Sequence, residues 1–304
     1  RRSSDLITAD DLTNYPKEES GIIVLIIIGL TGICIFIIGY LIYRRFVRKN
    51  KNSRNTSQTF RTLNNDKERI DKPNSIYLFG EFTVRDRNNK DITYMFSTKL
   101  RQMFFLVLQY SIEDGITSQR LSNLIWPDKP EDKVKNSRGV TINHLRKALG
   151  ELDGIEFVYD KGYFKIVLTD ECYCDFVRCI QIISTGIEEN REELIEILTR
   201  GKFLRSSDQA LFDTFKIDME HKLEPVLLIE IEKSFTTEAY QTTINLTEAL
   251  FNIDPLNDEA LVFQTKALQR LKLNEEARIR YQAFVVEYKK TMGSDYPHPY
   301  KDLI

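Results

Sequence analysis

The sequence of 304 residues is poor in the side chains and motifs on which most enzymes depend. It has only three histidines, His144, His221 and His298, and each is isolated in the sequence. It contains no G-x-x-x-x-G-K-S/T or G-x-G-x-x-G phosphate-binding loop, no H-E-x-x-H zinc motif and no nucleophile elbow. A carboxylate cluster at Glu188, Glu189, Glu192 and Glu193 is best interpreted as a solvated helix face. We therefore expect no catalytic activity.

Cysteine is also scarce, with four in the whole chain. Cys34 lies within an apolar segment, and Cys172, Cys174 and Cys179 form a C-x-C-x4-C cluster without a nearby histidine. A tetrahedral zinc site would need a fourth ligand. Three buried thiols in a reducing compartment are the interpretation we favour, because aromatic side chains surround them in the sequence. No metal or cofactor is expected.

Charge is distributed unevenly along the chain, although the net charge is only -2. The net charge is -2 over residues 1–43, +7 over 44–74, +2 over 75–168 and -9 over 169–304. Only the middle of the chain is suited to bind a polyanion, and the acidic last part would be repelled by one.

The longest hydrophobic run, residues 21–43, has no charged side chain. Its 23 residues would span roughly 34 Å as a helix, enough to cross the ~30 Å hydrocarbon layer of a membrane. The basic residues follow this run, whereas a signal peptide would carry them before it. We predict a single transmembrane helix.

Six basic side chains lie between Arg44 and Arg54, directly after the predicted span, whereas the preceding residues are mildly acidic. The positive-inside rule places the N-terminus outside and everything after residue 43 in the cytoplasm, at the inner membrane. Because the sequence starts at Arg1 and not at Met, we expect residues 1–20 to be the end of a longer extracytoplasmic region. Residues 44–74 are predicted to form a basic, flexible juxtamembrane linker.

A second basic stretch, Lys133 to Leu149, contains five cations and no acidic residue. Val134, Ile142, Leu145 and Leu149 recur at helical spacing and predict one buried stripe. The remaining face is cationic and rich in Asn, Ser and Thr, side chains that bind phosphate oxygens and base edges. We interpret it as a DNA recognition helix; an ordinary amphipathic surface helix is the alternative.

The elements around this helix occur in the order of a winged helix. β-rich runs separated by a turn at residues 87–90 predict a small antiparallel sheet over 75–96. Helices are predicted at Lys99 to Tyr110 and from Ser118, the latter capped by Thr117 or Ser118. Two short strands joined at Asp160-Lys161-Gly162 follow the basic helix. The fold class is therefore an α+β winged helix.

Four stretches carry a resemblance to a known family: LFGEFTV (Leu78 to Val84), L-x-x-x-I-W (Leu121 to Trp126), VTINHLRKAL (Val140 to Leu149) and GYFKI from Gly162. With them, residues 75–168 resemble the OmpR/PhoB-type winged-helix DNA-binding domain, especially the version found at the front of SARP-like regulators. The resemblance implies that the recognition helix enters the major groove and the wing the adjacent minor groove of promoter DNA.

The resemblance also implies roles for single residues. Asn136, Ser137, Asn143 and Arg146 would approach phosphates, and Val140, Thr141 and His144 would face base edges. Trp126 would lie against the DNA backbone and Lys161 at the wing tip, while Lys133, Lys135 and Lys147 add positive charge. Two positions depart from the family. His144 stands where many relatives have Arg, and Arg138 where relatives often have an apolar residue, so that Arg138 either pairs internally or contacts DNA.

Residues 169–304 predict an all-α domain and resemble the bacterial transcriptional activator domain of SARP-like proteins, which is related to tetratricopeptide repeats. Small and apolar residues at helical spacing predict stacked helix pairs with a break at Asp254-Pro255. They include Ala239, Leu246, Ala249, Leu250, Ala260, Ala267, Leu271, Ala277, Tyr281 and Phe284. The acidic charge favours contacts with proteins, among them RNA polymerase and a second copy of the chain.

Two functions are compatible with these features. The first is a membrane-anchored one-component transcriptional regulator that binds promoter DNA in response to an extracytoplasmic signal and is a homo-oligomer when active. The second is a membrane-tethered protein-interaction scaffold whose winged helix no longer binds DNA. The modest +2 charge of residues 75–168 keeps the second open, whereas the unpaired cations of the basic helix favour the first.

Overall fold

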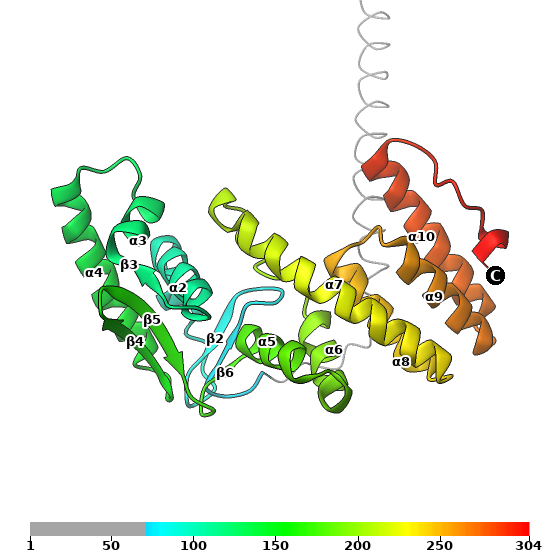
Figure 1. Ribbon diagram of the computed structural model, residues 1–304, viewed down its shortest axis with the longest axis horizontal. Coiled ribbons are helices and arrows are strands. Elements are labelled where there is room, and N and C mark those ends of the chain that lie inside the picture. Colours follow the sequence, from blue (N-terminus) through cyan, green and yellow to red (C-terminus); the bar gives the residue numbers. More distant parts are fainter. Residues whose placement is uncertain (1–70, 304) are drawn as a thin grey trace, which may run out of the picture. The chain divides into compact units, whose positions relative to one another are not determined.

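The computed structural model describes residues 71–303 (Figure 1). The predicted outer connector (1–20), the transmembrane helix (21–43) and all but the last residues of the linker (44–74) lie outside the described residues. None of the helices within residues 71–303 is long and apolar enough to span a membrane.

The first sheet has the strand order β2-β1-β6. β1 (Ser75–Tyr77) pairs antiparallel with β2 (Thr83–Arg85) and parallel with β6 (Tyr173–Cys174). The β-rich run expected after the turn at residues 87–90 is not a strand. A single bridge joins Arg85 to Asp91, and Thr93–Met95 form a 3-10 helix, η1. The Asp91 carboxylate accepts a hydrogen bond from the Thr93 backbone N–H, which favours this turn over an extended strand.

Three helices and a hairpin complete the winged-helix region (Figure 1). The three helices are α2 (Thr98–Ser111), α3 (Ser118–Ile125) and α4 (Glu131–Leu149). The second sheet has the order β3-β5-β4, all antiparallel, with β3 (Ile116–Thr117), β4 (Ile155–Asp160) and β5 (Tyr163–Leu168). Thr117 is the N-cap of α3 and accepts a hydrogen bond from the Arg120 backbone N–H.

The core of this region is centred on α2, which is apolar on most of its circumference. Its buried side chains are Leu100, Met103, Phe104, Phe105, Leu106, Val107 and Leu108. They contact α3, α4 and β5. A helix that buries so much of its surface needs elements on several sides, so α2 determines where α4 and the β4–β5 hairpin lie.

The remainder is helical: α5 (Asp175–Thr185), α6 (Arg191–Thr199), α7 (Asp213–Thr236), α8 (Tyr240–Ile253), α9 (Asp258–Arg270) and α10 (Asn274–Met292). Short 3-10 helices occur at Glu188–Asn190 (η2), Ala210–Phe212 (η3) and Tyr300–Leu303 (η4). Helices α7 to α10 pack consecutively, and the predicted break at Asp254-Pro255 separates α8 from α9. Leu271, expected in the buried stripe, lies after the end of α9 and is 38% exposed.

The first sheet and the helical region are joined through a buried carboxylate. Asp175, the first residue of α5, is fully buried and accepts hydrogen bonds from the backbone N–H groups of Leu78 (2.7 Å) and Phe79 (3.0 Å). The Leu204 N–H donates to the Leu78 carbonyl at 2.8 Å, and the Gly80 N–H donates to the Lys202 carbonyl at 2.9 Å. The segment after β1 is therefore held on both sides by residues beyond 168.

Candidate nucleic-acid interface

The basic helix α4 begins at Glu131, two residues before the predicted basic stretch. Glu131 and Asp132 lie in its first turn, and Arg146 and Lys147 lie in its last turn. Acidic groups at a helix N-terminus and basic groups at its C-terminus both stabilise the helix dipole. The buried side is formed by Val134, Leu145, Ala148 and Leu149, with Ile142 half-buried beside them, so the predicted apolar stripe is confirmed.

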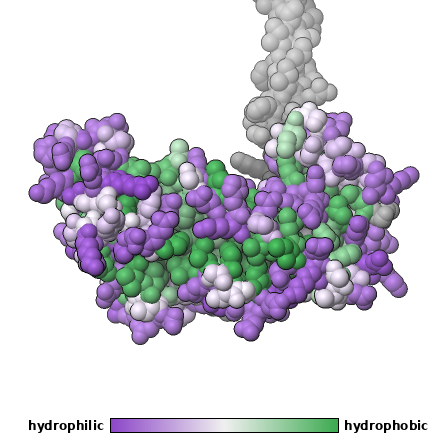
Figure 2. All heavy atoms as spheres, viewed as in Figure 1, coloured by the Kyte–Doolittle hydropathy of each residue, from purple (hydrophilic) through white to green (hydrophobic). Residues whose placement is uncertain are grey.

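Most predicted DNA-contacting side chains are on the opposite, exposed side of α4. They are Lys133, Lys135, Asn136, Val140, Asn143, His144, Arg146 and Lys147. Four of them are cations: Lys133, Lys135, Arg146 and Lys147. None of these four forms an ion pair within residues 71–303, so no internal anion competes with a phosphate for them. Figure 2 shows a mostly hydrophilic surface over α3 and α4 in this view. That these side chains contact DNA stays a prediction.

Ser137 and Thr141 are only half-buried and already have hydrogen-bond partners. The Lys129 ammonium donates to the Ser137 hydroxyl at 3.2 Å, and the Thr141 hydroxyl donates to the Ser137 carbonyl at 2.8 Å. The Thr141 proton is therefore engaged within the helix, which leaves its methyl group and oxygen lone pair for a base edge.

Arg138 is paired internally, which decides between the two alternatives left open by the sequence. Its guanidinium donates to the Ser122 hydroxyl at 2.6 Å and to the Ser118 carbonyl at 3.3 Å, both on α3. The side chain thus joins α4 to α3.

Trp126 lies in the core, where only 6% of its surface is exposed. It follows α3 as the C-cap residue, and its backbone N–H donates to the Ser122 carbonyl. The indole is part of the same buried cluster as α2, so most of the ring is not available to a DNA backbone.

Lys129, a residue that sequence reasoning missed, extends the basic surface ahead of α4. It is exposed, and its ammonium lies beside Ser137 on the first turns of the helix. The Pro127-Asp128-Lys129-Pro130 segment predicts a helix break, and its single cation gives no local signal. The position of Lys129 beside α4 is seen only in the folded chain, where the turn places this loop next to Ser137.

The wing is the hairpin β4–β5, and its two-residue loop is Lys161-Gly162. Both residues have positive φ, 47° and 93°, as a type I′ turn requires. Lys161 is exposed at the tip as predicted, next to Tyr159 and Tyr163, which are 53% and 39% exposed. The Arg146 guanidinium lies 5.7 Å from the centre of the Phe157 ring, so the last turn of α4 contacts the wing directly.

The three cysteines within residues 71–303 are buried free thiols, as predicted: Cys172, Cys174 and Cys179. Burial raises the pKa of the Cys172 thiol to about 12, with a smaller contribution from the Asp153 carboxylate. Burial likewise raises the pKa values of Cys174 and Cys179. The three side chains are therefore neutral thiols at physiological pH and pack as small apolar groups.

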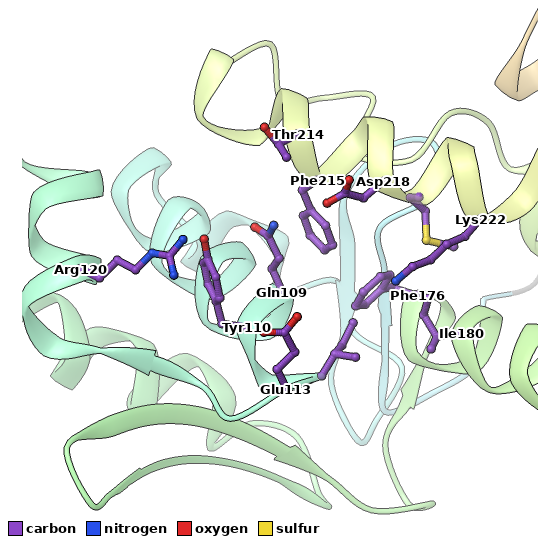
Figure 3. Close-up of a pocket in the computed structure, with 12 residues that line it drawn as sticks. Gln109, Tyr110, Glu113, Arg120, Phe176, Ile180, Thr214, Phe215, Asp218 and Lys222 are labelled. Atoms are coloured by element: carbon purple, nitrogen blue, oxygen red, sulfur yellow. The ribbon is translucent and has the colours of Figure 1, made fainter.

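A cavity of about 330 Å³ lies between α2 and α3 on one side and α5 and α7 on the other (Figure 3). Its lining includes the buried side chains of Phe176, Phe215 and Met219, and its polar residues include Glu113 and Lys222. No histidine or cysteine lines it, so its residues do not indicate nucleophilic or metal-dependent chemistry.

Comparison with known proteins finds similarity in structure alone. No family model matches the chain, and no curated protein matches it by sequence. A solved structure of Mycobacterium tuberculosis EmbR in complex with a low-affinity phosphopeptide is similar, with a TM-score of 0.52 at 16% sequence identity. The match covers 75% of this chain and 63% of the EmbR chain, so this chain accounts for less than two thirds of its length. The comparison shows a shared fold, a winged-helix-like region followed by an all-α helical region.

Proposed function

We propose that this chain is a membrane-anchored transcriptional regulator that binds promoter DNA through α4 and the β4–β5 wing. The observation that carries the proposal is the exposed side of α4. It presents Lys133, Lys135, Arg146 and Lys147 without internal anionic partners among the described residues, interleaved with amides and small side chains. Such a surface combines salt-dependent phosphate binding with groups able to contact base edges.

In the proposed complex, α4 lies in the major groove. The Asn136 and Asn143 amides offer donors and acceptors to phosphates or adenine edges, and Val140 presents an apolar surface to a thymine methyl group. Arg138, held by Ser118 and Ser122, sets the angle between α3 and α4. Lys161 approaches the adjacent minor groove from the wing tip.

The proposed anchor is the uncharged segment 21–43, with the N-terminus outside and the winged helix in the cytoplasm. A change in an outer region would alter how copies of the chain associate in the membrane. Two associated copies of the chain that bind two half-sites occupy a promoter far more fully than a single copy on one half-site. A small change in association would therefore change promoter occupancy strongly. The acidic helical region would contact other proteins, with RNA polymerase as one candidate.

Salt-dependent DNA binding tests the proposal. Residues 68–304 would be titrated with promoter DNA from the same locus and with a random-sequence pool, by fluorescence anisotropy at several salt concentrations. We expect affinity to fall steeply with salt. The variant His144→Ala, Arg146→Ala, Lys147→Ala should bind weakly, with a log–log slope shallower by about 0.9 for each phosphate that is no longer neutralised.

A matched control removes two exposed cations far from α4 in sequence, Lys266→Ala and Arg270→Ala on α9. This control should keep the wild-type affinity and slope. If neither DNA is bound at low salt by the wild type, even when the chain is artificially dimerised, the proposal is wrong. The scaffold function would then replace it, and the partner of the helical region would be sought.

A further inference from the structure

The outer side of α10 is an exposed helix face at the end of the helical array (Figure 1). α10 packs against α9, and its buried residues are Ala277, Arg280 and Phe284. On the opposite side, Ile279 is 46% exposed and Val286 is 52% exposed. At 100° per residue these two side chains lie within about 20° of each other around the helix axis, so they form one apolar strip.

The residues around this strip are arranged symmetrically along the helix. Ile279 and Val286 are equally distant from a point between Gln282 and Ala283. The acidic pair Glu275 and Glu276 and the basic pair Lys289 and Lys290 are also equally distant from that point. If a two-fold axis through that point related two copies of α10, the acidic residues of each copy would lie opposite the basic residues of the other.

We propose that α10 is a self-association surface, on which the α10 of a second copy packs in the antiparallel direction. Ile279 of one copy then covers Val286 of the other, and Glu275 and Glu276 face Lys289 and Lys290 at both ends. Ala283, a small side chain at the centre, lets the two helices approach closely. The inference deepens the proposed function and rests on it, because it specifies the contact through which anchored copies would pair.

The chain's own described residues leave this side of α10 open. The segment after Met292 folds back elsewhere: the Tyr296 ring contacts Phe284 and Tyr288, and the Tyr300 ring contacts Tyr281. Three of the four charged residues have partners near the surface: Arg278 for Glu275 at 3.7 Å, Asp295 for Lys289 at 2.8 Å and Glu287 for Lys290 at 3.0 Å. The fourth, Glu276, pairs at 3.6 Å with the buried Arg280. Exposed pairs of this kind are weak and exchange readily for partners on a second copy.

The contact is small, because it rests on one helix from each copy. Interfaces of that size give weak association between free molecules. Confinement of two anchored chains to one membrane raises their effective concentration, so a weak contact is sufficient there. The pairing is accordingly expected in the membrane and at high protein concentration.

Cysteine crosslinking of the full chain in membranes tests the register. In a Cys34→Ser background, Gln282→Cys lies beside its own counterpart across the two-fold axis. Mild oxidation should therefore give a disulfide-linked dimer. Glu259→Cys, exposed on α9, is the matched control and should remain monomeric. Equal crosslinking at the two positions would overturn the proposal.

Charge reversal tests the pairing itself. In the Gln282→Cys background, Glu275→Lys alone or Lys290→Glu alone should lower the crosslinked fraction about threefold, because like charges then face each other. The two changes together restore opposite charges and should restore crosslinking. Failure of the combined variant to recover would overturn the antiparallel arrangement.

The apolar strip is tested in the same background by Ile279→Asp, which should lower crosslinking about tenfold by exposing the partner's apolar surface and burying a charge. Ile229→Asp on α7, where the wild-type side chain is 64% exposed, is the control and should have no effect. None of these readouts requires DNA. Loss of crosslinking with intact DNA binding therefore refutes only the α10 contact, and the reverse result refutes only DNA recognition.

Discussion

Arg138 and Lys147 are two cations of one helix with different environments. The Arg138 guanidinium is bound to Ser118 and Ser122, whereas Lys147 is exposed and has no ion pair among the described residues. A charge that is already engaged inside the protein contributes little to counterion release on DNA. Removal of Arg138 should therefore change mainly the stability of the fold, and removal of Lys147 mainly the salt dependence of DNA binding.

We expect Arg138→Met to lower the free energy of unfolding by about 1–3 kcal/mol, because it leaves the buried Ser122 hydroxyl oxygen without its donor. Its DNA affinity should keep the wild-type salt slope. Lys147→Met should change stability by less than about 0.5 kcal/mol and reduce the slope by about 0.9. Urea unfolding and anisotropy titrations measure both; an altered salt slope for Arg138→Met would mean that it contacts DNA.

The buried Asp175 carboxyl should make stability depend on pH. Burial raises the pKa of its carboxyl from 3.8 to about 7, although the Phe79 and Leu78 N–H groups and the Arg200 guanidinium favour the charged form. Because the folded pKa is the higher one, the folded state binds more protons between those values. The contribution of Asp175 to stability should therefore decrease as pH rises from about 4 through about 7.

The variant Asp175→Asn removes the titration and keeps one acceptor oxygen. Urea unfolding at pH 5, 6, 7 and 8 should show that the wild type loses stability relative to the variant as pH rises. At pH 5 the variant should be less stable by about 1 kcal/mol, since the amide does not reproduce both hydrogen bonds. A difference that is constant across this range would show that Asp175 has the same charge throughout.

Helix α4 and the β4–β5 wing form one structural unit. Arg146 in the last turn of α4 lies over Phe157 of β4, and α2 packs against both α4 and β5. Each element also contains one glycine at which an added Cβ would meet no atom within 4 Å, Gly139 in α4 and Gly162 in the wing turn. The two differ in backbone conformation alone.

Substitution by alanine should therefore have opposite effects at these glycines. Gly139→Ala should stabilise α4 by about 0.5–1 kcal/mol, since alanine has less backbone freedom to lose in a helix. Gly162→Ala should destabilise the wing by about 1 kcal/mol or more, because its φ of 93° is unfavourable for a residue with a Cβ. Thermal unfolding of the two variants side by side measures the difference; a shift of the same sign in both would contradict the assigned turn.

At the scale of the molecule, the winged-helix region is completed by residues that follow the wing. β6 pairs with β1, Asp175 binds the backbone of Leu78 and Phe79, and residues 202–204 hold the other side of that segment. Upstream, Asp71 forms ion pairs with Arg85 and Arg200, so the folded part also begins before Ser75.

A chain that ends at Leu168 should consequently lose the packing of its first sheet. We expect residues 68–168 to give poorly dispersed amide resonances and non-cooperative unfolding, because buried Ile76, Leu78 and Phe79 would face water. Residues 68–304 should unfold cooperatively. A well-dispersed spectrum from the shorter piece would show that β6 and Asp175 are dispensable.

Residues 21–43 are predicted to anchor the chain in a membrane. The full chain should remain in the membrane fraction after extraction with alkaline carbonate, and residues 68–304 should be found in the supernatant. In spheroplasts, added protease should leave the part after residue 43 intact. Release of the full chain by carbonate would contradict a spanning segment at 21–43.

Features that depend on neighbouring residues follow from the amino-acid sequence alone. Hydrophobic periodicity predicts α2, α4, α8, α9 and α10, and the Lys161-Gly162 pair predicts the wing turn, because helix faces and tight turns are set by side chains a few positions apart. The exposed cationic side of α4 followed from the same periodicity.

Features that depend on residues far apart in the sequence are seen only in the folded chain. The pairing of Arg138 with α3, the burial of Trp126, the position of Lys129 and the completion of the first sheet by β6 all need contacts that no local pattern encodes. The same holds for α10: its symmetric charges can be read in the sequence, but their exposure depends on which side of the helix packs against α9. Packing chooses one face of each element, and that choice decides which side chains remain available for binding.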